Sequence, residues 1–331
     1  MTGDELAAVV PAGGRNEIVV ATERLTKRYG ERAVVDSVSL TVHRGEVYGF
    51  LGPNGAGKTT TLRMLLGLVR PTAGRATVLG AMPGSRTAVA GTGALVEGPG
   101  FYPYLSGRDN LRVLARYRRL PETAVDAALD RVDLTGRGRD AFRSYSLGMK
   151  QRLGVAAAML GEPDLLVLDE PTNGLDPAGM ADMRSLLVDV AGGGQTVILS
   201  SHLLAEVQEI CERVGVIAGG RLLAESTVAG LLGDTAILLR AEPLDRALAV
   251  AMRVAGTDAV AVVGDREDRA VRLPGAPDLV PMLTRALVAE DVDVREIRIE
   301  ERSLEEVFFR LSQGLSRPGT VFLSPDREVS R

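Results

Sequence analysis

One stretch of the sequence has the residue types and spacing of a phosphate-binding loop. Gly52, Gly57, Lys58 and Thr59 fit the pattern G-x-x-x-x-G-K-[ST]. Glycines let the backbone turn tightly and direct its N–H groups onto phosphate oxygens. The lysine can reach terminal phosphates, and the hydroxyl can hold Mg²⁺. The predicted phosphate-binding residues are Gly52, Pro53, Asn54, Gly55, Ala56, Gly57, Lys58, Thr59 and Thr60.

The segments on either side of this loop suit the same function. Residues 46–51 are mostly apolar and predict a short strand, and the leucines after Thr60 have helical spacing as far as Leu68. A helix that starts at the loop adds its partial positive charge to the phosphate site. The alternative is a glycine-rich turn without function, which does not account for the complete pattern with both flanks.

A pair of acids follows an apolar run further along the chain. The run Leu165–Leu168 predicts a strand buried on both faces, and it ends in Asp169 and Glu170. A carboxylate at such a strand end can hold Mg²⁺ through water, which suits Asp169. The next carboxylate, Glu170, can act as a general base toward an attacking water. The alternative is a solvated acidic turn, which the upstream phosphate loop makes the weaker interpretation.

The elements that must position these groups alternate between strand and helix. Strands are expected at 18–20, 34–35, 38–42, 75–79, 164–169, 196–200 and 214–218, and helices at 60–68, 146–160, 178–190 and 203–211. This alternation predicts an α/β fold with a mostly parallel sheet, preceded by a small antiparallel sheet. Between about 98 and 138 the chain turns helical and arginine-rich. That arginine face is interpreted as solvated, with contact to an acidic partner as the alternative.

The length of the chain is enough for one large or two medium domains. We expect a tail at 1–15, a nucleotide-binding domain at 16–234 with a helical subdomain at about 98–160, a small α+β domain at 235–313 and a second tail at 314–331. The 331 residues have a net charge of −4, which implies no bulk attraction to nucleic acid. No apolar run reaches the ~18 residues of a membrane helix, and no signal-peptide pattern opens the chain. A cytoplasmic location is therefore expected.

A further motif completes a set that resembles the nucleotide-binding subunits of ABC transporters over roughly Ile18–Leu232. Residues 146–152, S-L-G-M-K-Q-R, are similar to that family's signature, usually L-S-G-G-Q. Ser146 and Gly148 are kept, whereas Leu147 and Met149 depart from the pattern; Gln151 also belongs to the predicted motif. By itself this motif fits a plain helix N-cap equally well. The resemblance implies that it faces the ATP of an opposite subunit.

The resemblance assigns roles to further residues. His202, at a strand end, resembles the histidine that contacts the γ-phosphate and helps align the water and Glu170, while His43 is interpreted as structural. Tyr29 resembles the aromatic residue that stacks on adenine; an edge tyrosine in a turn is the alternative. Asp176 lies in the equivalent of the D-loop, which couples two facing sites. Glu97 stands where the family usually has a glutamine, and it joins Thr59 and Asp169 as a predicted Mg²⁺ ligand.

As a whole, the resemblance implies a P-loop ATPase cassette with an antiparallel subdomain, a helical subdomain and a C-terminal α+β domain. It implies ATP and Mg²⁺ as cofactors and a head-to-tail dimer, with itself or with a paralogous cassette. Its membrane permease would be a separate polypeptide, with the cassette on the cytoplasmic face. Residues 301–308 resemble the extension of drug- and peptide-exporting ATPases, which favours export. The alternatives are a soluble ATPase acting in translation or DNA repair and a nucleotide-sensing regulator.

Overall fold

The computed structural model describes residues 17–233, 235–256, 260–265, 269–275, 277–300 and 303–314. The chain divides into two compact units, the first running to Thr227 and the second formed by Val228–Arg310. The predicted tails, residues 1–15 and all of 314–331 except Gly314, lie outside the described residues.

The first unit begins with an antiparallel sheet of four strands. Strand β1 is central, with β2 and β3 on either side of it, and β5 also pairs with β1; the bounds are β1 Ile18–Tyr29, β2 Arg32–Val38, β3 Thr41–His43 and β5 Ala73–Val78. The strand expected at 38–42 is in fact two strands. The Thr22 hydroxyl donates to the Val38 carbonyl and accepts from the Leu40 N–H. Where β2 ends, this side chain therefore takes the place of backbone-to-backbone hydrogen bonds.

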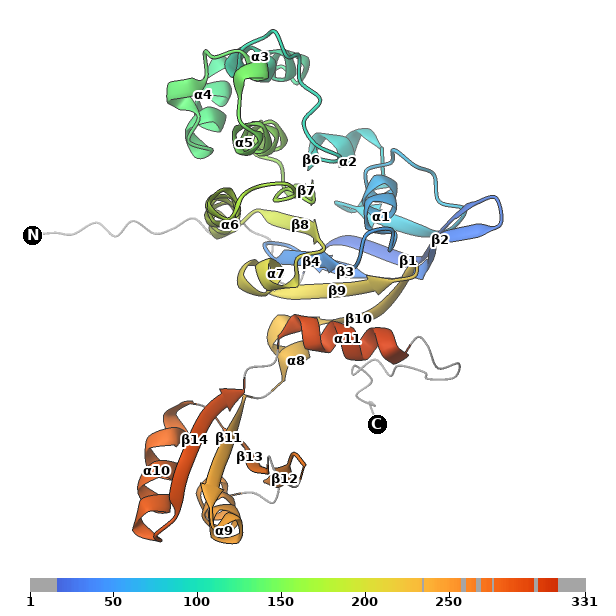
Figure 1. Ribbon diagram of the computed structural model, residues 1–331. Helices are drawn as coiled ribbons and strands as arrows, with labels where there is room; N and C mark the ends of the chain where they lie inside the picture. Colours follow the sequence, from blue (N-terminus) through green and yellow to red (C-terminus); the bar gives the residue numbers. More distant parts are fainter. Residues whose placement is uncertain are drawn as a thin grey trace, which may run out of the picture. The chain divides into compact units, whose positions relative to one another are not determined.

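A second sheet of six strands forms the centre of the unit (Figure 1). Its order is β10-β9-β4-β8-β7-β6, with bounds β4 Val47–Leu51, β6 Thr92–Leu95, β7 Leu165–Asp169, β8 Thr196–Ser201, β9 Arg213–Ala218 and β10 Arg221–Thr227. All neighbours are parallel except β9 and β10, which form a hairpin. The helices that connect these strands are α1 Lys58–Leu65, α2 Arg86–Ala90, α6 Pro177–Gly192 and α7 Leu204–Ile210. The predicted α/β fold is confirmed.

Helices α3 (Gly107–Tyr117), α4 (Glu122–Arg131) and α5 (Leu147–Met159) gather at one end of this unit, as Figure 1 shows. Two short 3-10 turns, η1 Thr135–Arg137 and η2 Phe142–Ser144, lie between α4 and α5. The arginines of α3 join it to α4, because Arg108 pairs with Asp126 at 2.5 Å and Arg112 pairs with Glu122 at 2.6 Å. Part of the arginine-rich face is thus used inside the subunit.

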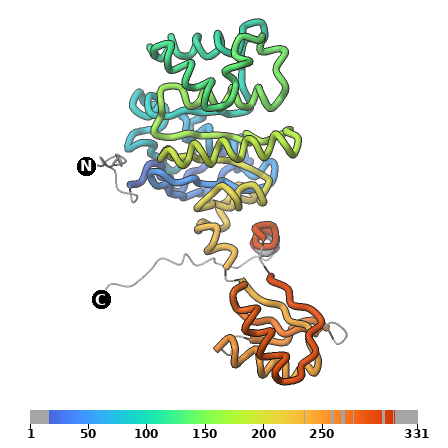
Figure 2. Tube along the Cα trace, turned by 90° about the vertical axis from the view of Figure 1, so that its left-hand side faces the viewer, coloured from blue at the N-terminus to red at the C-terminus, as the bar shows by residue number. Residues whose placement is uncertain are grey.

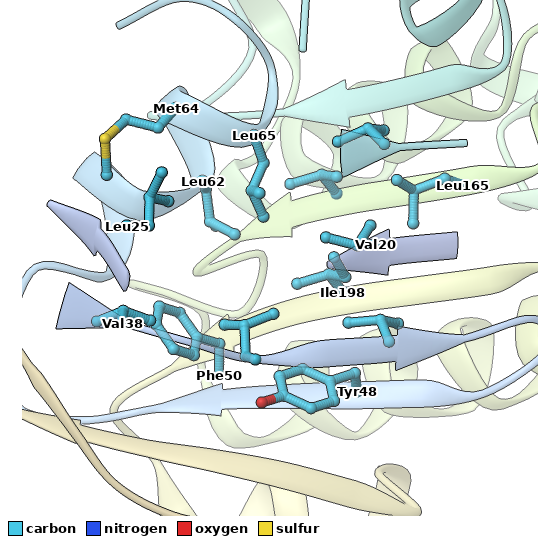
Figure 3. Packing of buried hydrophobic residues seen from close by; sticks show 14 of the residues in the cluster. Val20, Leu25, Val38, Tyr48, Phe50, Leu62, Met64, Leu65, Leu165 and Ile198 are labelled. Atoms are coloured by element: carbon cyan, nitrogen blue, oxygen red, sulfur yellow. The ribbon is translucent and has the colours of Figure 1, made fainter. Parts of the chain in front are cut away.

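The core of the first unit lies between its two sheets and around α1 (Figure 3). Leu62 and Leu65 of α1 pack with Phe50 of β4, Ile198 of β8 and Val20 of β1, all of them buried. Each fully buried side chain of this size contributes roughly 1.5–3 kcal/mol. The helix that follows the phosphate loop is therefore held from two sides.

Strand β6 and helix α5 approach each other so closely that only glycine fits between them. A Cβ atom on Gly93 would lie 1.8 Å from the Ala158 carbonyl oxygen near the end of α5. The position of α5 on the sheet therefore depends on the absence of a side chain at residue 93.

The second unit is a small α+β fold, traced from yellow-orange to red in Figure 2. Its antiparallel sheet has the order β12-β13-β11-β14, with bounds β11 Ala236–Glu242, β12 Ala261–Val263, β13 Ala270–Pro274 and β14 Asp293–Glu300. The helical segments are α8 Val228–Leu232, α9 Leu244–Ala255, η3 Pro277–Leu279, α10 Val280–Ala289 and α11 Leu304–Gly314. Alternate residues of β11, Ile237 and Leu239, pack with α9 and α10, so both helices cover one face of the sheet.

Helix α8 and strand β12 can be compared with the bounds predicted from the sequence. Helix α8 precedes the predicted domain boundary at residue 235. The apolar run at 259–263 also predicts a strand. Strand β12 begins at Ala261, while Ala259 lies outside the described residues.

Candidate active site

The loop between β4 and α1 has a shape that only glycine permits at two points. Gly57 has a φ of 107°, and a Cβ there would lie 2.6 Å from the Val34 carbonyl oxygen. At Gly52 a Cβ would lie 2.2 Å from the carbonyl oxygen of Ile217 on β9. The loop therefore wraps tightly at the start of α1, where free N–H groups and the helix dipole favour an anion.

Lys58, the first residue of α1, is 5% exposed and folds back over this loop. Its Nζ donates to the Gly52 carbonyl at 2.6 Å and lies 3.0 Å from Glu170 Oε1. A buried ammonium group needs such partners, because burial of an unpaired charge is costly. Lys58 is thus held where it can exchange its present contacts for phosphate oxygens.

Glu170 connects Lys58 to a histidine. It follows β7, whereas His202 follows β8, and His202 Nδ1 donates to Glu170 Oε2 at 2.5 Å. Glu170 has a φ of 50°, an uncommon value for a residue other than glycine and one that concentrates at functional sites. The two oxygens of one carboxylate therefore contact an ammonium and an imidazole. This arrangement can polarise a water molecule and accept its proton.

Ser200 is a site residue that the sequence interpretation missed. Its Oγ donates to Asp169 Oδ1 at 2.5 Å and accepts from the Glu170 N–H at 3.1 Å, so one buried hydroxyl holds both acids. The parallel register could have revealed it, because Asp169 of β7 lies opposite Ser200 of β8. Polar residues that end neighbouring parallel strands meet at one edge of the sheet.

The side-chain oxygen atoms near the loop are of the chemical types that bind magnesium. Asp169 is 7% exposed, and its second oxygen makes no hydrogen bond to any described residue. Thr59 lies one residue into α1 and is half-buried. A carboxylate and a hydroxyl are ligands that Mg²⁺ accepts beside phosphate oxygens. Glu97, the third predicted ligand, instead pairs with Arg63 of α1.

Tyr29 ends β1 and presents its ring to solvent, with 53% of the residue exposed. Lys27 Nζ lies 5.0 Å from the centre of this ring and donates to the Arg70 carbonyl at 2.7 Å. A lysine fixed in this way supports one face of the ring through a cation–π contact. An exposed flat ring can stack on a base.

The predicted signature begins α5, and the predicted D-loop begins α6. Ser146 accepts from the Met149 N–H at 3.2 Å, and Asp176 accepts from the Gly179 N–H at 2.9 Å, so each caps its helix. Both line an open cavity of about 560 Å³, together with Leu147, Gly148 and Met149. Gln151 differs from these residues because it is 8% exposed and points away from solvent. In this conformation its side chain is not available to a facing subunit.

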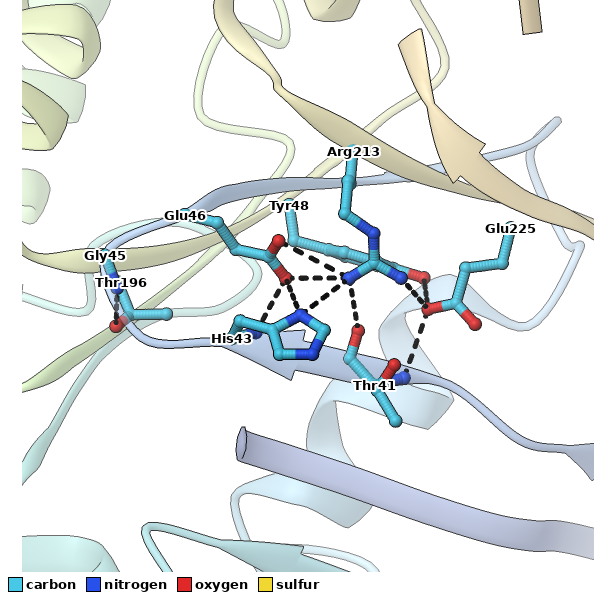
Figure 4. Close-up of polar contacts among 8 residues, drawn as sticks. All are labelled: Thr41, His43, Gly45, Glu46, Tyr48, Thr196, Arg213 and Glu225. Atoms are coloured by element: carbon cyan, nitrogen blue, oxygen red, sulfur yellow. Dashed lines mark hydrogen bonds and ion pairs between the residues drawn. The ribbon is translucent and has the colours of Figure 1, made fainter. Parts of the chain in front are cut away.

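His43 belongs to a separate polar cluster near the start of β4, shown in Figure 4. Arg213 is at its centre, 3.1 Å from Glu46 and 3.3 Å from Glu225, and it donates to His43 Nδ1 at 3.1 Å. The Tyr48 hydroxyl donates to Glu225 in the same cluster, and burial raises the pKa of Tyr48 well above its usual value. The cluster joins β3, β4, β9 and β10, as a structural role for His43 requires.

Comparison with known proteins identifies the family. Residues 35–173 match the family described as ABC transporter. The chain is 37% identical over 308 residues to the uncharacterized ABC transporter ATP-binding protein YdbJ of Bacillus subtilis, covering 92% of this chain and 98% of YdbJ. It is 38% identical over 303 residues to the bacitracin transport ATP-binding protein BcrA of Bacillus licheniformis, covering 89% and 98%. The chain belongs to the ATP-binding proteins of ABC transporters.

A solved structure, that of an ATP-binding subunit of an ABC transporter, supports the same conclusion. It superposes with a TM-score of 0.59 at 28% identity, covering 64% of this chain and 91% of its own. The predicted cassette fold and ATPase activity are thereby confirmed as properties of this family. Within the part of the chain that the structure describes, no helix is long and apolar enough to cross a membrane.

Proposed function

We propose that this chain is the ATP-hydrolysing subunit of a bacterial exporter for an antibiotic, drug or peptide. The observation that carries the proposal is the contact of Glu170 with both Lys58 and His202 beside a loop shaped for phosphate. Export of such compounds is supported by the likeness to BcrA, which extends over 89% of this chain and therefore includes the second unit.

In this proposal ATP lies on the loop from Gly52 to Thr60, and its adenine stacks on Tyr29. The Thr59 hydroxyl and the Asp169 carboxylate hold Mg²⁺, with Ser200 fixing Asp169 in orientation. When bound, Mg²⁺ neutralises charge on the β- and γ-phosphates. Lys58 reaches the same phosphates from the other side of the loop.

For hydrolysis, Glu170 accepts a proton from the attacking water, and His202 keeps the carboxylate in place. In this structure Lys58 engages one oxygen of Glu170 at 3.0 Å. When the γ-phosphate binds Lys58, that oxygen of Glu170 can contact the attacking water instead.

We further propose that two cassettes pair head to tail, with the capped ends of α5 and α6 facing the partner's nucleotide. Support comes from the open cavity that Ser146 and Asp176 share, since two helix N-termini together favour an anion. The partner is a second copy of this chain or a paralogous cassette.

Work on a membrane requires a separate permease, and the cassette would act at the cytoplasmic face. A shallow apolar groove of about 220 Å³ is our candidate for the permease contact. It is bordered by Leu68 and Val89, whose exposed fractions are 68% and 55%. Exposed apolar side chains grouped in this way mark interaction surfaces.

The test is co-expression with a candidate membrane permease from the same organism, followed by purification from membranes. We expect the two proteins to co-purify and ATP hydrolysis to rise when a transported compound is added. Val89→Glu should release the permease while leaving ATP binding intact, and Val288→Glu is a matched control on an exposed valine of the second unit. A cassette that hydrolyses no ATP, alone or with the permease, would refute the proposal.

A further inference from the structure

Glu206 is a buried carboxylate for which the proposed reaction has no role. It lies in the first turn of α7, where the helix dipole favours a negative charge, and it is 8% exposed. Its Oε2 accepts a hydrogen bond of 2.8 Å from the hydroxyl of Thr172, which is 3% exposed. Because burying a carboxylate is costly, its presence in the interior draws attention to what this hydrogen bond holds in place.

Thr172 belongs to the turn that starts at the proposed general base. The Asn173 N–H donates to the Glu170 carbonyl at 3.1 Å, and the Leu175 N–H donates to the Thr172 carbonyl at 3.1 Å. These bonds join residues 170–175 into two overlapping turns directly after β7. A shift of Thr172 is therefore passed along the backbone to Glu170, which lies two residues before it.

The segment after β7 and the segment after β8 are joined by two side-chain contacts. One is the contact of Glu170 Oε2 with His202 Nδ1, and the other is the hydrogen bond between Thr172 and Glu206; their partners are 32 and 34 residues apart in the sequence. Glu170 has a φ of 50°, a conformation that persists only where the surroundings require it. The bond to Glu206 is thus one of two side-chain contacts that tie this turn to the next segment.

We infer that Glu206 is a positioning residue for ATP hydrolysis, which holds the turn at Thr172 so that Glu170 faces the attacking water. The inference rests on the proposed function, in which Glu170 is the general base. Glu206 acts through Thr172 and does not itself contact the nucleotide. Since a misplacement of about 1 Å can lower a reaction rate about 10²-fold, loss of this hydrogen bond is expected to slow turnover. Nucleotide binding depends on the loop from Gly52 to Thr60 and is expected to persist.

The experiment removes each partner of the hydrogen bond in turn. Thr172→Val keeps the shape of the side chain and removes the donor, and Glu206→Leu removes the acceptor. For each variant we expect kcat to fall about 10- to 100-fold, while the affinity for a nonhydrolysable ATP analogue stays that of the wild type. Each should also unfold at a lower temperature, because one buried polar group is left without its partner.

The double variant Thr172→Val/Glu206→Leu separates positioning from mere stability. It leaves neither polar group buried without a partner, so its thermal stability should return toward that of the wild type. Its kcat should nevertheless stay as low as in the single variants, because nothing then fixes the turn, and the two effects on kcat should not add. A double variant in which kcat recovers together with stability would overturn the inference, as would normal turnover in either single variant.

Conservative variants on the same two residues complete the test. Thr172→Ser keeps the hydroxyl and should keep kcat. Glu206→Gln leaves a neutral acceptor and a weaker hydrogen bond, so kcat should fall several-fold with analogue binding unchanged. This variant decides the question if the aliphatic ones do not fold, since an unchanged kcat would then overturn the inference.

A control on the same helix and a comparison with the base itself keep the conclusions separate. Glu209→Leu changes an exposed glutamate of α7 that pairs with Arg184, and it should leave kcat unchanged. Full hydrolytic activity of Glu170→Gln would overturn the proposed function. Low activity of Glu170→Gln with normal activity of Glu206→Leu would overturn the role of Glu206 alone.

Discussion

Lys58 Nζ and Glu170 Oε1 lie 3.0 Å apart, so the lysine proposed to bind phosphate and the proposed general base neutralise each other. Both are largely shielded from water, with side-chain exposures of 5% and 17%. Such a pair is stable only while both charges are present, because removal of one leaves the other without compensation. The two residues are therefore expected to respond to mutation as a unit.

The first prediction concerns Glu170. Glu170→Gln removes the base and the counter-charge of Lys58, so hydrolysis should fall by about 10²- to 10⁴-fold while nucleotide binding is kept or strengthened. Phosphate release and analogue binding measure the two quantities. Light scattering with saturating ATP should also show this variant as a dimer. Glu209→Gln, which breaks an exposed pair with Arg184, is the control and should hydrolyse ATP normally.

The second prediction separates the two interpretations of Ser146. Asp is as good an N-cap as Ser, whereas Ala costs about 1 kcal/mol. Ser146→Asp should therefore keep thermal stability but lose hydrolysis, because its charge repels a facing γ-phosphate. Ser146→Ala should lose some stability and retain more activity than the aspartate variant. A fully active Ser146→Asp enzyme would leave Ser146 as a plain cap.

The third prediction concerns the exposed ring of Tyr29. Tyr29→Ala should weaken nucleotide binding by about 1–2 kcal/mol, roughly five- to thirtyfold, while Tyr29→Phe keeps most of the affinity. Since stacking needs only a flat ring, ATP and GTP should lose affinity equally. Tyr117→Ala alters another exposed tyrosine, on α3, and should bind normally. Selective loss of ATP binding alone would argue against stacking.

The fourth prediction follows from the buried Cys211. Burial raises the pKa of its thiol, so the folded protein binds this proton more tightly than the unfolded chain. The resulting stability is complete below the unfolded thiol pKa of about 8.5 and declines above it, by up to about 1.4 kcal/mol per pH unit.

Urea unfolding between pH 7 and 9.5 measures that decline, and Cys211→Ala should remove the thiol's share of it. A thiol reagent at pH 8 should label the wild type only as fast as the protein unfolds. Rapid labelling of the folded protein would show that the thiol is accessible after all.

Many of the strands and helices could be predicted from the sequence, because the strands are apolar runs and the apolar residues of the helices recur at helical spacing. The exceptions have physical causes. Strand β6 contains Gly93, which is there for close approach to α5 and has little tendency to form a strand. Strand β1 continues to Tyr29 through mostly polar residues, because it leaves β3 and β5 to pair with β2. Strands β10 and β13 were not predicted either, although Val271 and Leu273 of β13 alternate with Arg272 and are buried.

For the candidate site, motif spacing predicted Lys58, Asp169 and Glu170, and the family resemblance added His202. The structure brings these residues together. It could not predict their partners. Ser200, Arg63 and Lys27 act through contacts between segments distant in sequence, and no local pattern encodes those contacts. The roles of Glu97 and of the signature residues remain predictions, and the Ser146 variants above address the signature.

The absence of a side chain at Gly93 affects more than the strand that contains it. Helix α5 rests against it at one end and begins at Ser146 at the other. A methyl group at residue 93 would push the end of α5 away from β6 and so displace Ser146, which we propose to face the partner's nucleotide. Gly93→Ala is therefore expected to lower ATP hydrolysis, although every residue that we propose to contact ATP is unchanged.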